Sequence, residues 1–157
     1  MKVVILCGGY GTRIRDVAED LPKPMIPVGN YPIIWHIMKY YATMGHNEFI
    51  LCLGYKSNVI KDYFLNYEAR TNDFSIILGD KDSMEVLNNH TEQNWKITFA
   101  ETGLDSMTGT RIKKIQKYIK PGESFMLTYG DGLGNVDLEA LISFHKSHNK
   151  ALTLTCF

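Results

Sequence analysis

Apolar residues in this chain fall into short runs with two alternating spacings. Residues 2–7 contain a continuous apolar run, which is typical of a buried strand in a parallel sheet, and the apolar-rich segments 48–53, 124–129 and 151–157 are also expected as strands. Between them, apolar residues recur three and four positions apart, which predicts amphipathic helices over residues 32–44, 57–67, 110–118 and 137–148. Strands that alternate with helices predict an α/β layered fold around a mostly parallel sheet.

The middle of the chain departs from this alternation. Phe74–Leu78 and Trp95–Ala100 have the composition of strands, and a polar loop separates them. They predict either a separate ribbon or additional strands of the main sheet. The last expected strand, 151–157, ends the sequence without a polar tail, and this favours a domain that continues further.

Composition and charge exclude several classes of protein. The 157 residues suit a single domain, and 17 basic residues balance 17 acidic ones, so nucleic acid or an anionic membrane is not an expected partner. No apolar stretch is long enough to span a membrane, and the run after Met1 is too short for a secretory signal. We therefore expect a cytoplasmic protein in which Cys7, Cys52 and Cys156 are buried free thiols.

The segment after the first expected strand is rich in glycine. It has the sequence Gly8-Gly9-Tyr10-Gly11-Thr12-Arg13. Open α/β sheets bind ligands beyond the carboxyl ends of their strands, and glycines allow backbone N–H groups to approach an anion closely. Ile14 stands where a dinucleotide-binding loop needs its third glycine, and no P-loop pattern is present. An anion-binding loop and a tight turn with a surface arginine both remain open at this stage.

A second segment, Leu21-Pro22-Lys23-Pro24-Met25, places one lysine between two prolines. The prolines restrict the backbone around Lys23 and lower the entropy that is lost when its position is fixed. Lys23 is therefore a candidate for a fixed positive charge at a phosphate. The alternative is a solvated lysine in a proline-rich loop.

Together, the two segments resemble the sugar-phosphate nucleotidylyltransferase family, whose signature is G-G-x-G-T-R followed by P-K-P. Three further segments are similar to the glucose-1-phosphate cytidylyltransferase branch of that family: Tyr31–Lys39, Ser106–Arg111 and Thr128–Gly132. The resemblance covers Met1 to Phe157. It implies a Rossmann-like three-layer sandwich with a mostly parallel mixed sheet, the nucleotide-diphospho-sugar transferase fold.

The resemblance also implies a reaction and a site. Glucose 1-phosphate would attack the α-phosphorus of CTP, giving CDP-glucose and pyrophosphate with the help of Mg²⁺. Arg13 and Lys23 would be the catalytic cations, and Asp131 the magnesium ligand. The nucleotide would contact Gly8, Gly9, Gly11, Thr12, Arg13, Lys23, Gly109 and Arg111.

Some of these residues could instead have no part in binding or catalysis. Arg111 would otherwise be a surface arginine of a helix, and Asp131 part of an ordinary Asp-Gly turn. Family members are longer, so the resemblance implies that 1–157 is the nucleotide-binding portion of one domain, in a protein that forms homo-oligomers. A nucleotide-binding module without efficient turnover and an enzyme that uses UTP or dTTP are the alternatives. A dehydrogenase-like dinucleotide domain is a weaker one, because the third glycine is missing.

Overall fold

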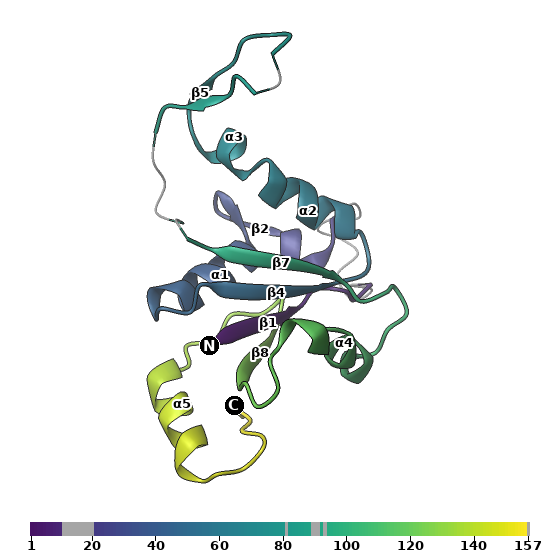
Figure 1. Ribbon diagram of the computed structural model, residues 1–157, viewed down its shortest axis with the longest axis vertical. Helices are drawn as coiled ribbons and strands as arrows, with labels where there is room; N and C mark the ends of the chain where they lie inside the picture. Colours follow the sequence, from purple (N-terminus) through teal and green to yellow (C-terminus); the bar gives the residue numbers. More distant parts are fainter. Residues whose placement is uncertain (11–20, 81, 89–91, 93, 157) are drawn as a thin grey trace.

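The computed structural model describes residues 1–10, 21–80, 82–88, 92 and 94–156. Its centre is a sheet of four parallel strands in the order β7-β4-β1-β8 (Figure 1). The strands are β1 (Lys2–Leu6), β4 (Glu48–Leu53), β7 (Lys96–Glu101) and β8 (Phe125–Tyr129). Three of them coincide with predicted apolar runs, and β7 shows that Trp95–Ala100 belongs to the main sheet.

Helices cover both faces of this sheet. On one face, Val3 and Ile5 of β1 pack with residues of α1 (Ile33–Thr43), α2 (Ser57–Leu65) and α5 (Leu138–Ser147). On the other face, Val4 of β1 packs toward Ile115, which follows α4 (Thr108–Lys114). Alternate residues of a strand point to opposite faces, so one apolar strand supplies two cores. The predicted three-layer α/β architecture is confirmed.

Local sequence fixes where the helices begin and end. Pro32 is the N-cap of α1, where its missing N–H costs no helical hydrogen bond, and Gly45 follows the helix with a φ of +79° that favours glycine. At α5, the Asp137 carboxylate accepts a hydrogen bond of 2.9 Å from the Ala140 amide. The predicted helices over 32–44 and 137–148 are therefore confirmed. The helix expected over 110–118 is split into α4 and a 3₁₀ turn, Gln116–Tyr118.

Some expectations are wrong. The segment expected as a strand after residue 150 has no regular structure over 152–156, and Cys156 is exposed rather than buried. Strand β5 is only Phe74–Ser75, and it pairs with β6 (Glu85–Val86) in a small antiparallel ribbon. This ribbon and α3 (Tyr67–Thr71) lie at the opposite end of the molecule from α5 (Figure 1). A second short hairpin, β2 (Pro27–Val28) with β3 (Tyr31–Pro32), was not predicted.

The two phenylalanines Phe49 and Phe144 allow a test of this core. Phe49 of β4 is 1% exposed, whereas Phe144 of α5 is 60% exposed. We expect Phe49→Ala to lower the free energy of unfolding by about 3–5 kcal/mol, because it removes a buried ring and leaves a cavity. Phe144→Ala is the matched control, with an expected loss below about 1 kcal/mol. Urea denaturation of both variants measures the difference, and equal losses would contradict this description of the core.

Candidate functional site

The strand order predicts a ligand crevice at the carboxyl edge of the sheet, between β1 and β8. After β1 the chain builds β4 and β7 on one side, and it then returns to place β8 on the other side of β1. In open α/β sheets, ligands bind beyond the carboxyl ends of the strands at the point where the strand order reverses. The segments that leave β1 and β8 at this point contain Gly8, Gly9 and Asp131.

A glycine brings the Lys23 segment against this crevice. Lys23 begins the 3₁₀ turn η1 (Lys23–Met25), and Pro24 of that turn lies against Gly130. A Cβ atom on Gly130 would meet the Cys7 sulfur at 3.0 Å and Pro24 Cγ at 3.2 Å, so a larger residue would push the segments apart. The Gly130 amide also donates to the Leu6 carbonyl at 3.0 Å.

This packing brings two of the predicted site residues together. Lys23 Nζ lies 3.6 Å from Asp131 Oδ2, which makes an ion pair but is too long for a hydrogen bond. Both side chains retain access to solvent, with 23% of Lys23 and 42% of Asp131 exposed. A cation and a carboxylate therefore lie side by side near the carboxyl ends of β1 and β8, and each is partly exposed to solvent.

Arg111 occupies a different position from the one expected. Its side chain is only 5% exposed, and its guanidinium lies behind the first loop rather than at the surface of helix α4. Nη2 donates to the carbonyl oxygens of Gly8 at 2.9 Å and Leu104 at 3.1 Å. Nη1 contacts the Thr102 hydroxyl at 2.6 Å, the Gly103 carbonyl at 2.8 Å and the Leu53 carbonyl at 3.1 Å.

These contacts correct one of the two expectations for Arg111, the surface arginine, and its contact with a nucleotide stays a prediction. It is not a solvated helix residue, and its terminal nitrogens donate to the chain's own oxygen atoms. Two terminal nitrogens carry four N–H groups, and five acceptors surround them. Arg111 therefore links the loop after β1 to the loop after β7 through their carbonyl groups.

A rim of polar contacts joins the glycine loop to the loop after β7. The Tyr10 hydroxyl donates to Asp105 Oδ1 at 2.7 Å, and this hydrogen bond raises the pKa of Tyr10. The Tyr10 ring lies 5.5 Å from the Tyr55 ring, measured between centroids. Lys114 Nζ donates to the Thr102 carbonyl at 2.7 Å. None of these residues was singled out from the sequence, because each depends on loops that meet only in the folded chain.

The remaining predicted site residues divide into two groups. Gly11, Thr12 and Arg13 lie outside the described residues. Gly9 and Gly109 are exposed, and a Cβ atom at either position would meet no described atom within 4 Å. Space for a ligand is thus present at both positions within the part of the chain that the structure describes.

The Asp131 carboxylate suits a Mg²⁺ ion that also binds substrate phosphates, rather than a metal ion held by protein ligands alone. Among the described residues, no group of three or more His, Cys, Asp or Glu side chains could hold a metal ion. Mg²⁺ is commonly bound by one or two carboxylates together with substrate phosphates and water. The accessible Asp131 carboxylate fits that mode. Burial raises the pKa of the neighbouring Cys7 thiol, which remains protonated and is unsuited as a thiolate ligand or nucleophile.

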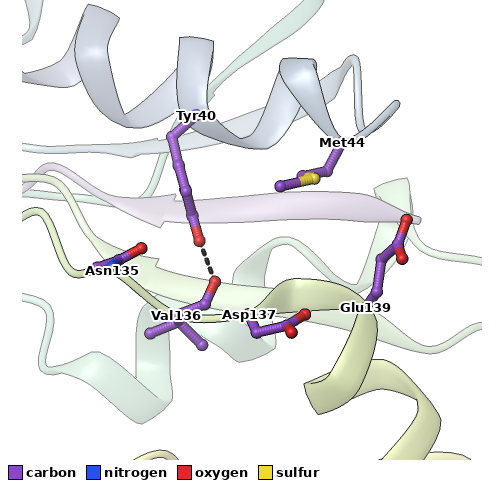
Figure 2. A pocket seen from close by; sticks show the side chains of 6 residues that line it. All are labelled: Tyr40, Met44, Asn135, Val136, Asp137 and Glu139. Atoms are coloured by element: carbon purple, nitrogen blue, oxygen red, sulfur yellow. Dashed lines mark hydrogen bonds between the residues drawn. The ribbon is translucent and has the colours of Figure 1, made fainter.

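A separate cavity of about 490 Å³ lies near the C-terminal end of α1, and Figure 2 shows the six residues that line it. The Tyr40 hydroxyl donates to the Val136 carbonyl (Figure 2). Asp137 and Glu139 are the two acidic residues that line the cavity. No lining residue is cationic, so the cavity is unsuited to a phosphate. His46, just beyond α1, contacts the amino group of Met1, which places this end of the helix near the start of β1.

Comparison with known proteins identifies the class. The sequence model of the family described as "Nucleotidyl transferase" matches residues 2–157, and the chain belongs to this family. No helix in the described part of the chain is both long enough and apolar enough to cross a bilayer. The predicted family and fold are therefore confirmed.

Two similar proteins indicate a branch of the family to which this chain is similar. The chain is 50% identical over 155 residues to a "Probable glucose-1-phosphate cytidylyltransferase" of Bacillus subtilis, covering 99% of this chain and 59% of that protein. It is 46% identical to the glucose-1-phosphate cytidylyltransferase of Salmonella typhimurium, covering 99% of this chain and 60% of that protein. The chain thus spans about three-fifths of the length of these relatives.

Solved structures support the same fold. HddC from Yersinia pseudotuberculosis, in a complex with GMP-PN, superposes with a TM-score of 0.65 and 30% identity, covering 92% of this chain and 53% of HddC. UDP-glucose pyrophosphorylase, in a complex with UDP-glucose, gives the same TM-score at 16% identity, covering 94% of this chain and 53% of that one. At that identity the second likeness concerns the fold alone.

Proposed function

We propose that this chain carries the nucleotide-binding portion of a cytoplasmic enzyme that transfers a cytidylyl group from CTP to glucose 1-phosphate. The observation that carries the proposal is the pairing of Lys23 with Asp131 at the crevice between β1 and β8, beside the Gly8–Gly9 loop. Membership of the nucleotidyl transferase family supports the reaction class. Identities of 50% and 46% to two glucose-1-phosphate cytidylyltransferases favour CTP and glucose 1-phosphate as substrates.

In this reaction a phosphate oxygen of glucose 1-phosphate forms a bond to the α-phosphorus of CTP. The bond from that phosphorus to the bridging oxygen of the β-phosphate breaks, and pyrophosphate leaves with the bond's electron pair. The protein has little covalent chemistry to perform, so catalysis rests on positioning the reactants and stabilising negative charge.

We assign parts of this work to the predicted site residues. Gly8, Gly9, Gly11 and Thr12 would line the nucleotide, and Gly109 would border the same space. Lys23 and Arg13 would neutralise the α-phosphate and the departing pyrophosphate, since both carry a fixed positive charge. Asp131 would hold Mg²⁺, which supplies charge neutralisation at the phosphate oxygens when bound.

A pyrophosphate-release assay tests the proposal. The protein would be incubated with Mg²⁺, CTP and glucose 1-phosphate, and in parallel with either substrate omitted. We expect pyrophosphate only when both substrates are present. Pyrophosphate that forms equally without glucose 1-phosphate would contradict transfer to a sugar phosphate.

A second candidate is a module that binds the nucleotide without efficient turnover. The observation in its favour is that Lys23 and Asp131, the predicted site residues that the structure brings together, are both assigned to the nucleotide and its metal. It predicts saturable binding of Mg·CTP with no pyrophosphate release in the same assay. Release of pyrophosphate that depends on both substrates would eliminate it.

A further inference from the structure

Asp131 belongs to a glycine-rich segment that links β8 to α5. We call residues 130–136 the Asp131 loop, which has glycine at every second position from 130 to 134. One end of this loop is held where the Gly130 amide donates to the Leu6 carbonyl at 3.0 Å. Residues 131–135 make no backbone hydrogen bond to any other residue that the structure describes. The position of Asp131 therefore depends on how the far end of the loop is held.

A tyrosine of α1 holds that far end. The Tyr40 hydroxyl donates to the carbonyl of Val136, the last residue of the Asp131 loop (Figure 2). The Val136 side chain is partly buried and packs against the core beneath α1. The next residue, Asp137, is already the N-cap of α5. The Asp131 loop is thus fixed to β1 at one end and to α1 at the other, and the carboxylate lies between these two points.

The cavity beside α1 makes this hydrogen bond important for the loop. Asn135, Val136 and Asp137 all line the cavity of about 490 Å³. Figure 2 shows the Tyr40 side chain extending from α1 to the loop backbone at its edge. Because close packing is interrupted on this side, fewer van der Waals contacts hold the backbone there than in a filled core. The loop therefore depends on the Tyr40 hydroxyl more than a fully packed segment would.

The next residue of α1 contacts the chain on the other side of Asp131. Burial raises the pKa of Tyr41, and a side-chain hydrogen bond with Thr128 opposes that rise. Thr128 belongs to β8 and precedes Asp131 by three residues (131 − 128). Two successive tyrosines of one helix thus contact the chain before and after Asp131. Helix α1 sets the placement of both arms of this turn.

From these contacts we propose that Tyr40 is a positioning residue for the Asp131 carboxylate, a role that rests on the proposed function. The ion pair of Asp131 with Lys23 is too long for a hydrogen bond, so it does not fix the carboxylate by itself. Tyr40 holds the Asp131 loop in the conformation that meets Mg²⁺ and the phosphates of CTP. Less ordering is then needed when Mg·CTP binds, and this preserves affinity.

Nuclear magnetic resonance relaxation of the unliganded protein tests the clamp itself. Tyr40→Phe keeps the ring and removes only the hydrogen bond. We expect the order parameters of the amides of residues 131–136 to fall from about 0.85 toward about 0.6 in this variant. Tyr63→Phe is the matched control, because the buried Tyr63 hydroxyl of α2 has no hydrogen-bond partner in the described part of the chain. Unchanged order parameters in Tyr40→Phe would overturn the proposal.

Calorimetric titration with CTP over a series of Mg²⁺ concentrations connects the clamp to the metal. If Tyr40 positions Asp131, Tyr40→Phe needs about threefold to tenfold more Mg²⁺ for half-maximal binding of CTP, the scale of one lost hydrogen bond. At saturating Mg²⁺ its affinity for CTP should approach that of the unsubstituted protein. A merely structural role would lower the melting temperature and leave the Mg²⁺ dependence unchanged, which would overturn the proposal.

A double variant shows whether the effect acts through Asp131. In the Asp131→Asn background, Tyr40→Phe should cause no further change in the Mg²⁺ dependence, because both substitutions affect one carboxylate. An additive change would show that Tyr40 acts elsewhere. Absence of CTP binding by the unsubstituted protein at every Mg²⁺ concentration would instead refute the proposed function, and this proposal with it.

Discussion

Replacing Asp131 with asparagine is expected to lower the rate of pyrophosphate release by about 10²–10³-fold, the scale seen when one charge-stabilising group is lost from an active site. Asparagine keeps the size of the side chain and removes the negative charge that a magnesium ion requires. The rate should recover partly as the Mg²⁺ concentration is raised, because the phosphates of CTP still supply oxygen ligands. Steady-state assays over a series of Mg²⁺ concentrations measure both effects.

The matched control is Asp137→Asn. Asp137 caps α5 through the Ala140 amide, and asparagine caps helices about as well as aspartate. We expect this variant to retain both its rate and its dependence on Mg²⁺. An Asp131→Asn variant with the full rate at low Mg²⁺ would contradict the assignment of Asp131 as the metal ligand.

Replacing Lys23 with alanine is the second large effect, again with an expected loss of about 10²–10³-fold in turnover. The ammonium group would no longer stabilise the charge that develops on the departing pyrophosphate. Lys23→Ala should change the affinity for Mg²⁺ in the opposite direction to Asp131→Asn. Lys23 Nζ lies 3.6 Å from the Asp131 carboxylate, so its removal should tighten the binding of Mg²⁺ rather than weaken it. Magnesium dependence of the rate separates the two variants.

The sheet offers an ion pair of the same length as a control. Lys96 Nζ lies 3.6 Å from Glu48 Oε2, where β7 and β4 begin. Lys96→Ala removes a surface pair whose contribution to stability is about 0–1 kcal/mol, and it should leave turnover unchanged. Equal rates for Lys23→Ala and Lys96→Ala would show that Lys23 has no special part in the reaction.

Much of the fold could be predicted from the sequence because local signals and burial agree. Every residue of β4 after Glu48 is apolar, and each of these residues is buried. The end of the chain shows where this argument fails. Residues 152–154 have the pattern of a strand, but a strand also needs a partner that donates and accepts hydrogen bonds. In the part of the chain that the structure describes, these residues pair with no strand.

The residue types of the candidate site could be proposed from the sequence, but their relative positions could not. The proline-flanked lysine and the Gly-Asp-Gly turn pointed to Lys23 and Asp131, which the fold brings together across 108 positions of the chain (131 − 23). The orientation of Arg111 could not be predicted, since its carbonyl partners come from loops as distant as Gly8. A helical spacing pattern carries no information about which carbonyl groups will surround a buried cation.

Calorimetric titration with Mg·CTP, run beside Mg·UTP, tests the central claim most directly. The account predicts saturable binding of CTP and much weaker binding of UTP. Equal binding of the two would keep the nucleotidyl transferase site and contradict its selectivity for cytosine. If neither nucleotide binds, the claim that this chain forms a nucleotide site between β1 and β8 is contradicted.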